Sequence, residues 1–139
     1  MGLLKIGEAT YSTNWQGLHR NEPLLMAFRD YAKSNHLWES YRFLTTEFLP
    51  KRDYPLYIAE GGELEIDLPG AIRRAMTDLA DKGDWTMAAW KPHLERAQKA
   101  VIRSIDSDHL QGTSNKFWNS TEFAAFFRAQ VATNAKAAA

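Results

Sequence analysis

Apolar residues recur every three or four positions along most of this chain, which is the spacing of one face of an α-helix. The pattern returns in successive segments from Leu24 to Val131, and only one stretch, ELEIDL at 63–68, alternates apolar and acidic residues as a strand does. No other segment offers that stretch a partner strand, so we expect an extended loop there. The periodicity therefore predicts an all-α fold of about seven to nine helices.

Capping residues and prolines predict the helix ends in the first half of the chain. Asn21, followed by a glutamate and Pro23, is typical of an N-cap and a first helical turn. A second helical stripe runs over 37–48, and Pro50 should end that helix. The PLYIAE segment at 55–60 begins with proline and precedes two glycines, which predicts one or two helical turns.

The second half of the chain carries the same kinds of signal. Pro69 should open a helix that closes near Gly83, and residues 85–90 are expected to be helical. Pro92 should begin the strongest helix, because the residues after it keep a continuous apolar face. Asn119, with a glutamate three residues later, resembles a capping box and should start the last helix.

Length and charge limit the class of protein. With 139 residues and 45% hydrophobic content the chain fits one domain with one core, which we place at 15–131, between an N-terminal extension at 1–14 and a frayed tail at 132–139. Basic and acidic residues number 17 each, a balance that argues against binding to nucleic acid or anionic lipid. No apolar run reaches the length of a signal peptide or a membrane span, so we expect a cytoplasmic protein without an integral membrane segment.

The expected core consists of apolar side chains on the helical stripes. Its members are Leu24, Phe28, Trp38, Phe43, Ile72, Leu94, Val101, Ile105, Phe117 and Phe126. Aromatic residues at this spacing are typical of a packed interior and not of a cofactor site. We therefore expect no cofactor.

Histidine and aspartate residues raise the question of a metal site. The four histidines are never three or four residues apart, so no pair shares a helix face at ligand spacing. The chain has no cysteine, which excludes disulfides, thiolate zinc sites and a cysteine nucleophile. The run Asp106-Ser-Asp108 begins like a calcium loop, but Phe117 occupies the twelfth place, where a bidentate glutamate is needed. The sequence therefore predicts no metal site.

Side chains suited to hydrolysis cluster at 104–109, where serine, aspartate and histidine follow one another closely. Adjacent residues do not align a nucleophile, a base and an orienting acid, and no GxSxG turn is present. The glycine pair at 61–62 lacks the lysine and hydroxyl residue of a phosphate-binding loop. An enzyme with its own active site is therefore the poorest fit, and no catalytic residue is expected.

The segment from Asp106 to Trp118 joins the last two apolar-faced helices through thirteen mostly polar residues. We call this segment the hinge. It is either a binding surface or only a connector, because connecting segments are commonly polar and exposed. The residue types alone leave both interpretations open.

The order of these features resembles a known family of helical domains. The similar pieces are NWQGL (14–18), LLMAFRDYAKSNHLWESYRFLTTEF (24–48), YIAEGGELEIDLPGAIRR (57–74), LERAQKAVIRSIDSD (94–108) and KFWNSTEF (116–123). Together they are similar to the regulator of G-protein signalling (RGS) domain, which binds the α subunit of heterotrimeric G proteins and speeds its GTP hydrolysis. The resemblance covers roughly Trp15 to Phe127 and implies an RGS-like helical bundle.

The resemblance also implies three partner-binding loops. Their residues in this chain are Glu39, Ser40, Asp67, Ser104, Asp108, His109 and, more loosely, Lys116. Only Glu39 and Asp108 match the family pattern outright, because Ser40 and Asp67 stand where asparagine is usual and Ser104 where leucine is usual. The hinge is about four residues longer than the family pattern, and the segment 49–56 is much shorter, which removes most of one helix.

What the resemblance implies about function is regulation of another protein. An RGS domain supplies no catalytic group to the nucleotide and instead holds the switch segments in their transition-state arrangement. The chain is thus expected to bind a G-protein α subunit or another GTPase-like protein in signal transduction, acting at most as a GTPase activator and reaching a membrane only through that partner. The alternative is a non-catalytic interaction module that kept the scaffold and lost the activity.

The helical periodicity makes a prediction for the protein in solution. Its far-ultraviolet circular dichroism should be dominated by helix, with less than about a tenth strand, because only ELEIDL has a period of two. A spectrum with substantial sheet would contradict both the fold class and the resemblance.

Overall fold

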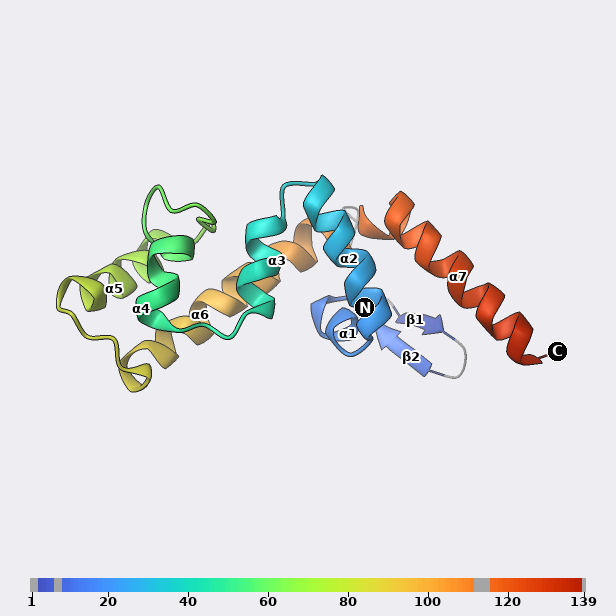
Figure 1. Cartoon of the computed structure of the whole chain (residues 1–139), viewed down its shortest axis with the longest axis horizontal. Coiled ribbons are helices and arrows are strands. Elements are labelled where there is room, and N and C mark those ends of the chain that lie inside the picture. Colours follow the sequence, from blue (N-terminus) through green and yellow to red (C-terminus); the bar gives the residue numbers. More distant parts are fainter. Residues whose placement is uncertain (1–2, 7–8, 112–115, 139) are drawn as a thin grey trace. The chain divides into compact units, whose positions relative to one another are not determined.

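The computed structural model describes the backbone of residues 3–6, 9–111 and 116–138, and the side chains of 13–111 and 116–130. Over this part of the chain helices dominate, which confirms the all-α prediction, and one short β-hairpin is added to them (Figure 1). The elements are β1 (Leu3–Ile6), β2 (Ala9–Ser12), α1 (Trp15–His19), α2 (Glu22–Ser34), α3 (Trp38–Thr45), α4 (Pro50–Asp53), η1 (Tyr54–Ile58), α5 (Gly70–Asp81), α6 (Met87–Ile105), η2 (Asp106–Leu110), η4 (Phe117–Asn119) and α7 (Thr121–Ala138). The stretch at 63–68 is a loop, as expected.

Contacts concentrate in two compact units. Unit 1 combines Met1–Asn35 with Ser104–Ala139, and unit 2 is the continuous segment His36–Arg103. A single domain at 15–131 was expected from length. Unit 1 is instead built from segments at opposite ends of the sequence, whereas unit 2 is built from neighbouring segments.

Unit 1 begins with a hairpin at residues expected to form a plain extension. β1 and β2 pair antiparallel, with Leu3 opposite Ser12. β2 also contacts α1, which begins after Asn14, whose side chain accepts a hydrogen bond from the Gly17 N–H at 3.0 Å. The chain therefore enters its first helix through a capped start that follows directly on the hairpin.

The interior of unit 1 forms where α2 meets the segment after the hinge. Asn21 caps α2 as predicted, because its side-chain oxygen accepts a hydrogen bond from the Leu24 N–H at 3.1 Å. Phe117 is fully buried, and its ring lies 5.1 Å from that of Phe28 and 5.4 Å from that of Tyr31. α7 also packs against α2.

The start of α7 differs from the prediction. Ser120, and not Asn119, is the N-cap: its hydroxyl oxygen accepts a hydrogen bond from the Phe123 N–H at 3.1 Å. Asn119 is unavailable for this role because it belongs to the 3-10 turn η4. Residues 132–138, expected as a frayed tail, continue the backbone of α7.

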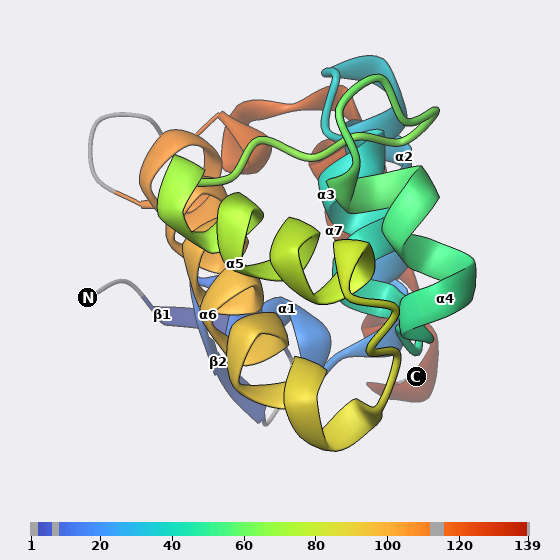
Figure 2. The ribbon, with the colours of Figure 1, turned by 90° about the vertical axis from the view of Figure 1, so that its left-hand side faces the viewer.

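Unit 2 contains α3, α4, η1, α5 and most of α6, with α4 and α5 nearest the viewer in Figure 2. Pro50 was expected to end the second helix, but α3 already ends at Thr45 and Pro50 opens α4. This placement fits proline, whose missing N–H costs nothing in a first helical turn. The predicted turn at 55–60 is present as the π-helical η1, one residue earlier than expected.

Both ends of α5 follow from the sequence. The helix starts directly after Pro69 and ends before Gly83, whose φ of +70° is the left-handed conformation that glycine favours. The Asp84 N–H donates to the Leu79 carbonyl and the Gly83 N–H to the Ala80 carbonyl, which is the Schellman pattern of a helix C-terminus.

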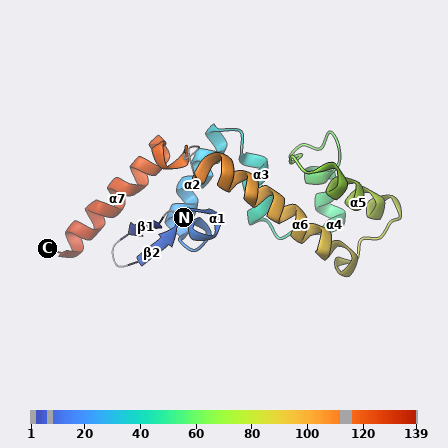
Figure 3. The ribbon, with the colours of Figure 1, turned by 180° about the vertical axis from the view of Figure 1, so that it is seen from behind.

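Pro92 does not begin α6, contrary to the prediction, because it lies inside one continuous helix (Figure 3). The helix starts after Thr86, whose hydroxyl oxygen accepts a hydrogen bond from the Ala89 N–H at 3.4 Å. The proline deprives the Ala88 carbonyl of its usual helical donor. Ala88 is exposed, so water can satisfy that carbonyl and the helix continues.

The core residues expected from sequence are buried, except that Trp38 and Ile72 are half-buried. Trp38 opens α3, where its ring stacks on Tyr41 at 5.6 Å and the Arg42 guanidinium lies 5.6 Å from its centre. Ile72 lies in the first turn of α5. Both exceptions occur at helix starts, where fewer neighbouring turns can cover a side chain.

Phe43→Ala should lower the free energy of unfolding by about 3–5 kcal/mol, because it leaves a cavity in a packed interior. Phe43 is 1% exposed and its ring lies within 5.9 Å of Phe48 and 5.8 Å of Tyr57. Phe127→Ala is the matched control, since Phe127 is 43% exposed, and it should cost about 1 kcal/mol at most. Urea unfolding followed by circular dichroism measures both, and equal costs would contradict the assigned core.

Candidate functional site

The residues predicted to bind a partner are divided between the two units. Glu39, Ser40 and Asp67 belong to unit 2. Ser104, near the end of α6, and the hinge residues Asp108, His109 and Lys116 belong to unit 1. The middle of the hinge, 112–115, lies outside the described residues. The structure thus brings Ser104 and the three predicted hinge residues into one unit and places the other three predicted residues in the second.

Of the four predicted residues in unit 1, three are exposed and one is not. Ser104, Asp108 and Lys116 face solvent, and the Ser104 hydroxyl donates to a carboxylate oxygen of Asp108 at 3.4 Å. His109 is half-buried. The three exposed residues therefore present a hydroxyl, a carboxylate and an ammonium group to the solvent.

Asp106 ties the start of the hinge to α1. Its carboxylate oxygen Oδ1 accepts a hydrogen bond from the Trp15 N–H at 2.7 Å. Burial raises the pKa of Asp106, although this hydrogen bond acts in the opposite direction. The bond satisfies one of the N–H groups that the first turn of a helix leaves without a helical partner.

His109 ties the same turn to α2. Its ring nitrogen Nδ1 lies 2.7 Å from the Tyr31 hydroxyl oxygen, and the two rings meet edge to face at 5.6 Å. Burial lowers the pKa of His109, the positive charge of Lys116 lowers it further, and Asp108 acts in the opposite direction. His109 therefore favours the neutral form, which can accept a hydrogen bond from Tyr31.

Two further bonds fix the backbone of this turn. The Gln111 N–H donates to the Asp106 carbonyl at 2.8 Å, and the indole N–H of Trp118 donates to the Leu110 carbonyl at 2.8 Å. Leu110 itself is 1% exposed. Asp106–Leu110 is thus held from inside the unit while its outer side chains remain free to meet a partner.

The loop that carries Asp67 is fixed in a comparable way in unit 2. The Ile66 N–H donates to the Tyr57 carbonyl at 2.9 Å, and the Arg73 guanidinium donates to the Ile58 and Ile66 carbonyls. Ile66 is buried and Asp67 is exposed. The alternation read in ELEIDL thus separates inward and outward side chains of a loop and not of a strand.

The other two predicted residues lie at the start of α3. Glu39 and Ser40 follow Trp38, the first residue of that helix, and both are half-buried. Leu37 precedes the helix without a side-chain cap. A carboxylate in the first turn is favourable because it lies near the positive end of the helix dipole, so Glu39 has a structural reason to be there besides any contact with a partner.

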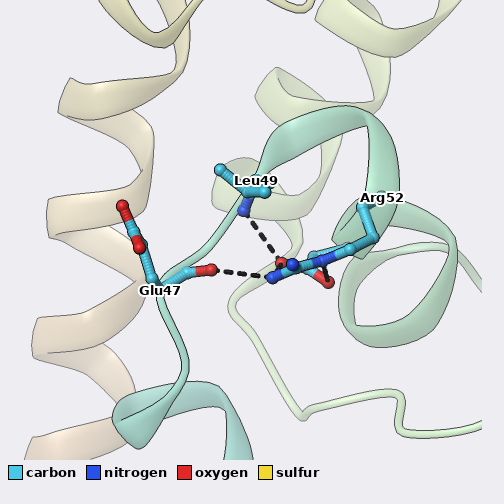
Figure 4. A network of polar contacts seen from close by, with 4 residues as sticks. Glu47, Leu49 and Arg52 are labelled. Carbon is cyan, nitrogen blue, oxygen red and sulfur yellow. Dashed lines mark hydrogen bonds and ion pairs between the residues drawn. The ribbon is translucent and has the colours of Figure 1, made fainter.

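A polar network that the sequence patterns did not predict lies between α3 and α4 (Figure 4). Arg52 donates to the Glu47 carbonyl at 2.9 Å and to Asp53, whose carboxylate accepts the Leu49 N–H at 2.8 Å. Burial acts to raise the pKa of Asp53, but the hydrogen bonds from Arg52 and Leu49 outweigh it, so the pKa lies below its ordinary value. Pro50 indicates the start of a helix, and an acidic residue in the turn after it, here Asp53, is the sequence signal for this cap.

Unit 2 also has an open groove of about 290 Å³ between α6 and the segment after α3. Its lining residues are Thr46, Glu47, Phe48, Met87, Lys91, Leu94, Glu95 and Gln98. None of the predicted partner-binding residues belongs to this lining. In the described part of the chain no three histidine, aspartate or glutamate side chains gather as metal ligands, and no helix is long and apolar enough to cross a bilayer.

Comparison of the chain with known proteins gives no relative. No protein-family model, curated protein or solved structure matches it. The function of the chain is therefore inferred from its residues and their geometry.

The turn at 106–110 allows structural and surface carboxylates to be told apart. Asp106→Ala should lower the free energy of unfolding by roughly 1–3 kcal/mol, because it leaves the Trp15 N–H without its acceptor. Asp106→Asn keeps an acceptor oxygen and removes the buried charge, so it should be at least as stable as the wild type at pH 7. Asp108→Ala should change stability by about 0.5 kcal/mol at most, because Asp108 is exposed.

Urea unfolding followed by tryptophan fluorescence measures these effects, and its pH dependence gives a second check. The pKa of Asp106 is raised above 3.8, so its contribution is fully present below that pH and is lost as pH rises through the folded-state pKa. Asp106→Asn should lack this loss. If Asp108→Ala is as costly as Asp106→Ala, Asp108 is a structural residue and its assignment to a binding surface fails.

Proposed function

We propose that this chain is an RGS-like regulator that binds the α subunit of a G protein through the first turn of α3, the loop around Asp67 and the hinge. Binding holds the switch segments of the partner, and acceleration of GTP hydrolysis is confined to a dedicated partner. The chain supplies no catalytic group in this scheme.

The observation that carries the proposal is the combination of fixed backbone and exposed polar side chains in two of the loops. Asp106 and His109 hold the hinge turn from inside, and Asp108 remains exposed. Arg73 holds the loop before α5, and Asp67 remains exposed. Loops that are ordered before binding lose less conformational entropy when a partner arrives.

The charges of these loops indicate the chemistry of the partner surface. Glu39, Asp67 and Asp108 are carboxylates, and Lys116 is the one predicted contact with a positive charge. Loops with these charges favour a partner that presents mainly basic groups and hydrogen-bond donors. The substitutions at Ser40, Asp67 and Ser104 change one contact in each loop relative to the family, which fits a partner different from an ordinary α subunit.

Single-turnover GTP hydrolysis by an α subunit, with and without this protein, tests the proposal. An ordinary α subunit should show weak or no acceleration, because losing two or three interface contacts at 1–2 kcal/mol or more apiece reduces affinity by a factor of hundreds. A dedicated partner should bind most tightly when loaded with GDP and aluminium fluoride, which imitates the transition state.

Variants locate the interface on that dedicated partner. Glu39→Ala and Asp108→Ala should each weaken binding roughly tenfold, while Glu95→Ala, an exposed carboxylate on α6, should leave it unchanged. Binding without any acceleration would favour the non-catalytic interaction module. Equal loss in all three variants, or no preference among nucleotide states, would contradict the proposed regulator, and strong acceleration on an ordinary α subunit would contradict the dedicated partner.

A further inference from the structure

Among the described contacts of the Asp106–Leu110 turn, the Tyr31–His109 pair stands out because its chemistry changes near neutral pH. It joins α2 to η2 through two side chains that are distant in sequence, and Tyr31 is 2% exposed. Neutral imidazole protonated on Nε2 offers Nδ1 as an acceptor for the Tyr31 hydroxyl. Protonated imidazole has no acceptor, and its charge is costly where water is excluded.

We infer that neutral His109 is a latch that holds the Asp106–Leu110 turn on α2, and that protonation of its imidazole releases the turn. The latch does not depend on the proposed partner. It is a property of unit 1 alone, and it gives the Asp106–Leu110 turn two states.

Charged groups near the latch affect how readily the His109 imidazole is protonated. Lys116 opposes protonation of His109 and Asp108 favours it, with the effect of Lys116 the larger of the two. On the α2 side, burial and then the charge of Glu122 on α7 raise the pKa of Tyr31. Tyr31 therefore keeps its proton and remains a donor at neutral pH, and the titrating member of the pair is His109.

The sign of the effect follows from the lowered pKa of His109. The unfolded chain takes up a proton near the ordinary value of 6.5, whereas the folded unit resists it until a lower pH. Stability contributed by the latch is thus present above pH 6.5 and is lost as pH falls through the folded-state pKa. The pKa of Asp106 is raised from its ordinary value of 3.8, so the stability linked to Asp106 increases as the pH falls. Asp106 therefore cannot cause a loss of stability near pH 6.

Two tryptophan indole N–H groups provide a reporter and an internal control. Trp118 donates to the Leu110 carbonyl at 2.8 Å and so senses the end of the turn. Trp90 donates to the Asp84 carbonyl at 2.6 Å within unit 2. Their resonances can be followed together in nitrogen–proton NMR spectra of the whole chain from pH 8 to pH 5.

The Trp118 indole resonance should titrate with the same midpoint as the His109 ring protons, and that midpoint should lie below 6.5. The Trp90 resonance should stay constant. His109→Asn, whose amide oxygen can stand in for Nδ1, should abolish the Trp118 titration, whereas His36→Asn, at an exposed position of unit 2, should leave it unchanged.

Tyr31→Phe is an independent second variant, and it tests the latch even if His109→Asn fails to fold. It removes the donor that stabilises the neutral ring, so the His109 midpoint should rise toward 6.5. An unchanged midpoint in Tyr31→Phe overturns the latch. A Trp118 resonance that is constant while His109 titrates, or that still titrates in a folded His109→Asn variant, overturns it as well.

Discussion

Packing of Phe117 against α2 is the contact on which the rest of unit 1 depends. Its ring contacts those of Phe28 and Tyr31, and it lies 5.0 Å from the Trp118 ring and 5.6 Å from the Phe123 ring. Burying an aromatic side chain of this kind stabilises a fold by several kcal/mol. After α6 the chain must therefore come back to α2, the helix that ends before Asn35. The hinge provides this connection.

The two alternative roles of the hinge, connector and binding surface, do not exclude each other. A connector that packs against helices must satisfy its buried polar groups. Asp106, His109 and the Leu110 carbonyl form hydrogen bonds with Trp15, Tyr31 and Trp118. These inward bonds leave Ser104 and Asp108 on the outside. The Asp106–Leu110 turn is thus fixed on its inner side, and Asp108 remains available on its outer side.

Local signals explain which parts of the fold could be predicted. Asn21 and Gly83 act on backbone groups within a few residues, so their caps can be read from sequence. The bonds at Asp106 and His109 join residues 91 and 78 positions apart, and no spacing rule connects such pairs. The candidate site shows the same limit. The exposure of Asp67 and Asp108 could be predicted because both residues are polar. The hydrogen bonds that fix their loops could not, because they depend on the fold.

Because inward hydrogen bonds fix the loops, the residues that stabilise the fold differ from the exposed residues that can contact a partner. Ser104, Asp67 and Asp108 can be replaced without touching the bonds made by Asp106, Arg73 or His109, because those bonds run inward to backbone groups and to Tyr31. A scaffold arranged in this way can change its contacts one residue at a time at little cost in stability. Ser104 and Asp67, two positions at which the sequence differs from the RGS pattern, are exposed in this way, so a change of contact at either position requires no change in the helices beneath it.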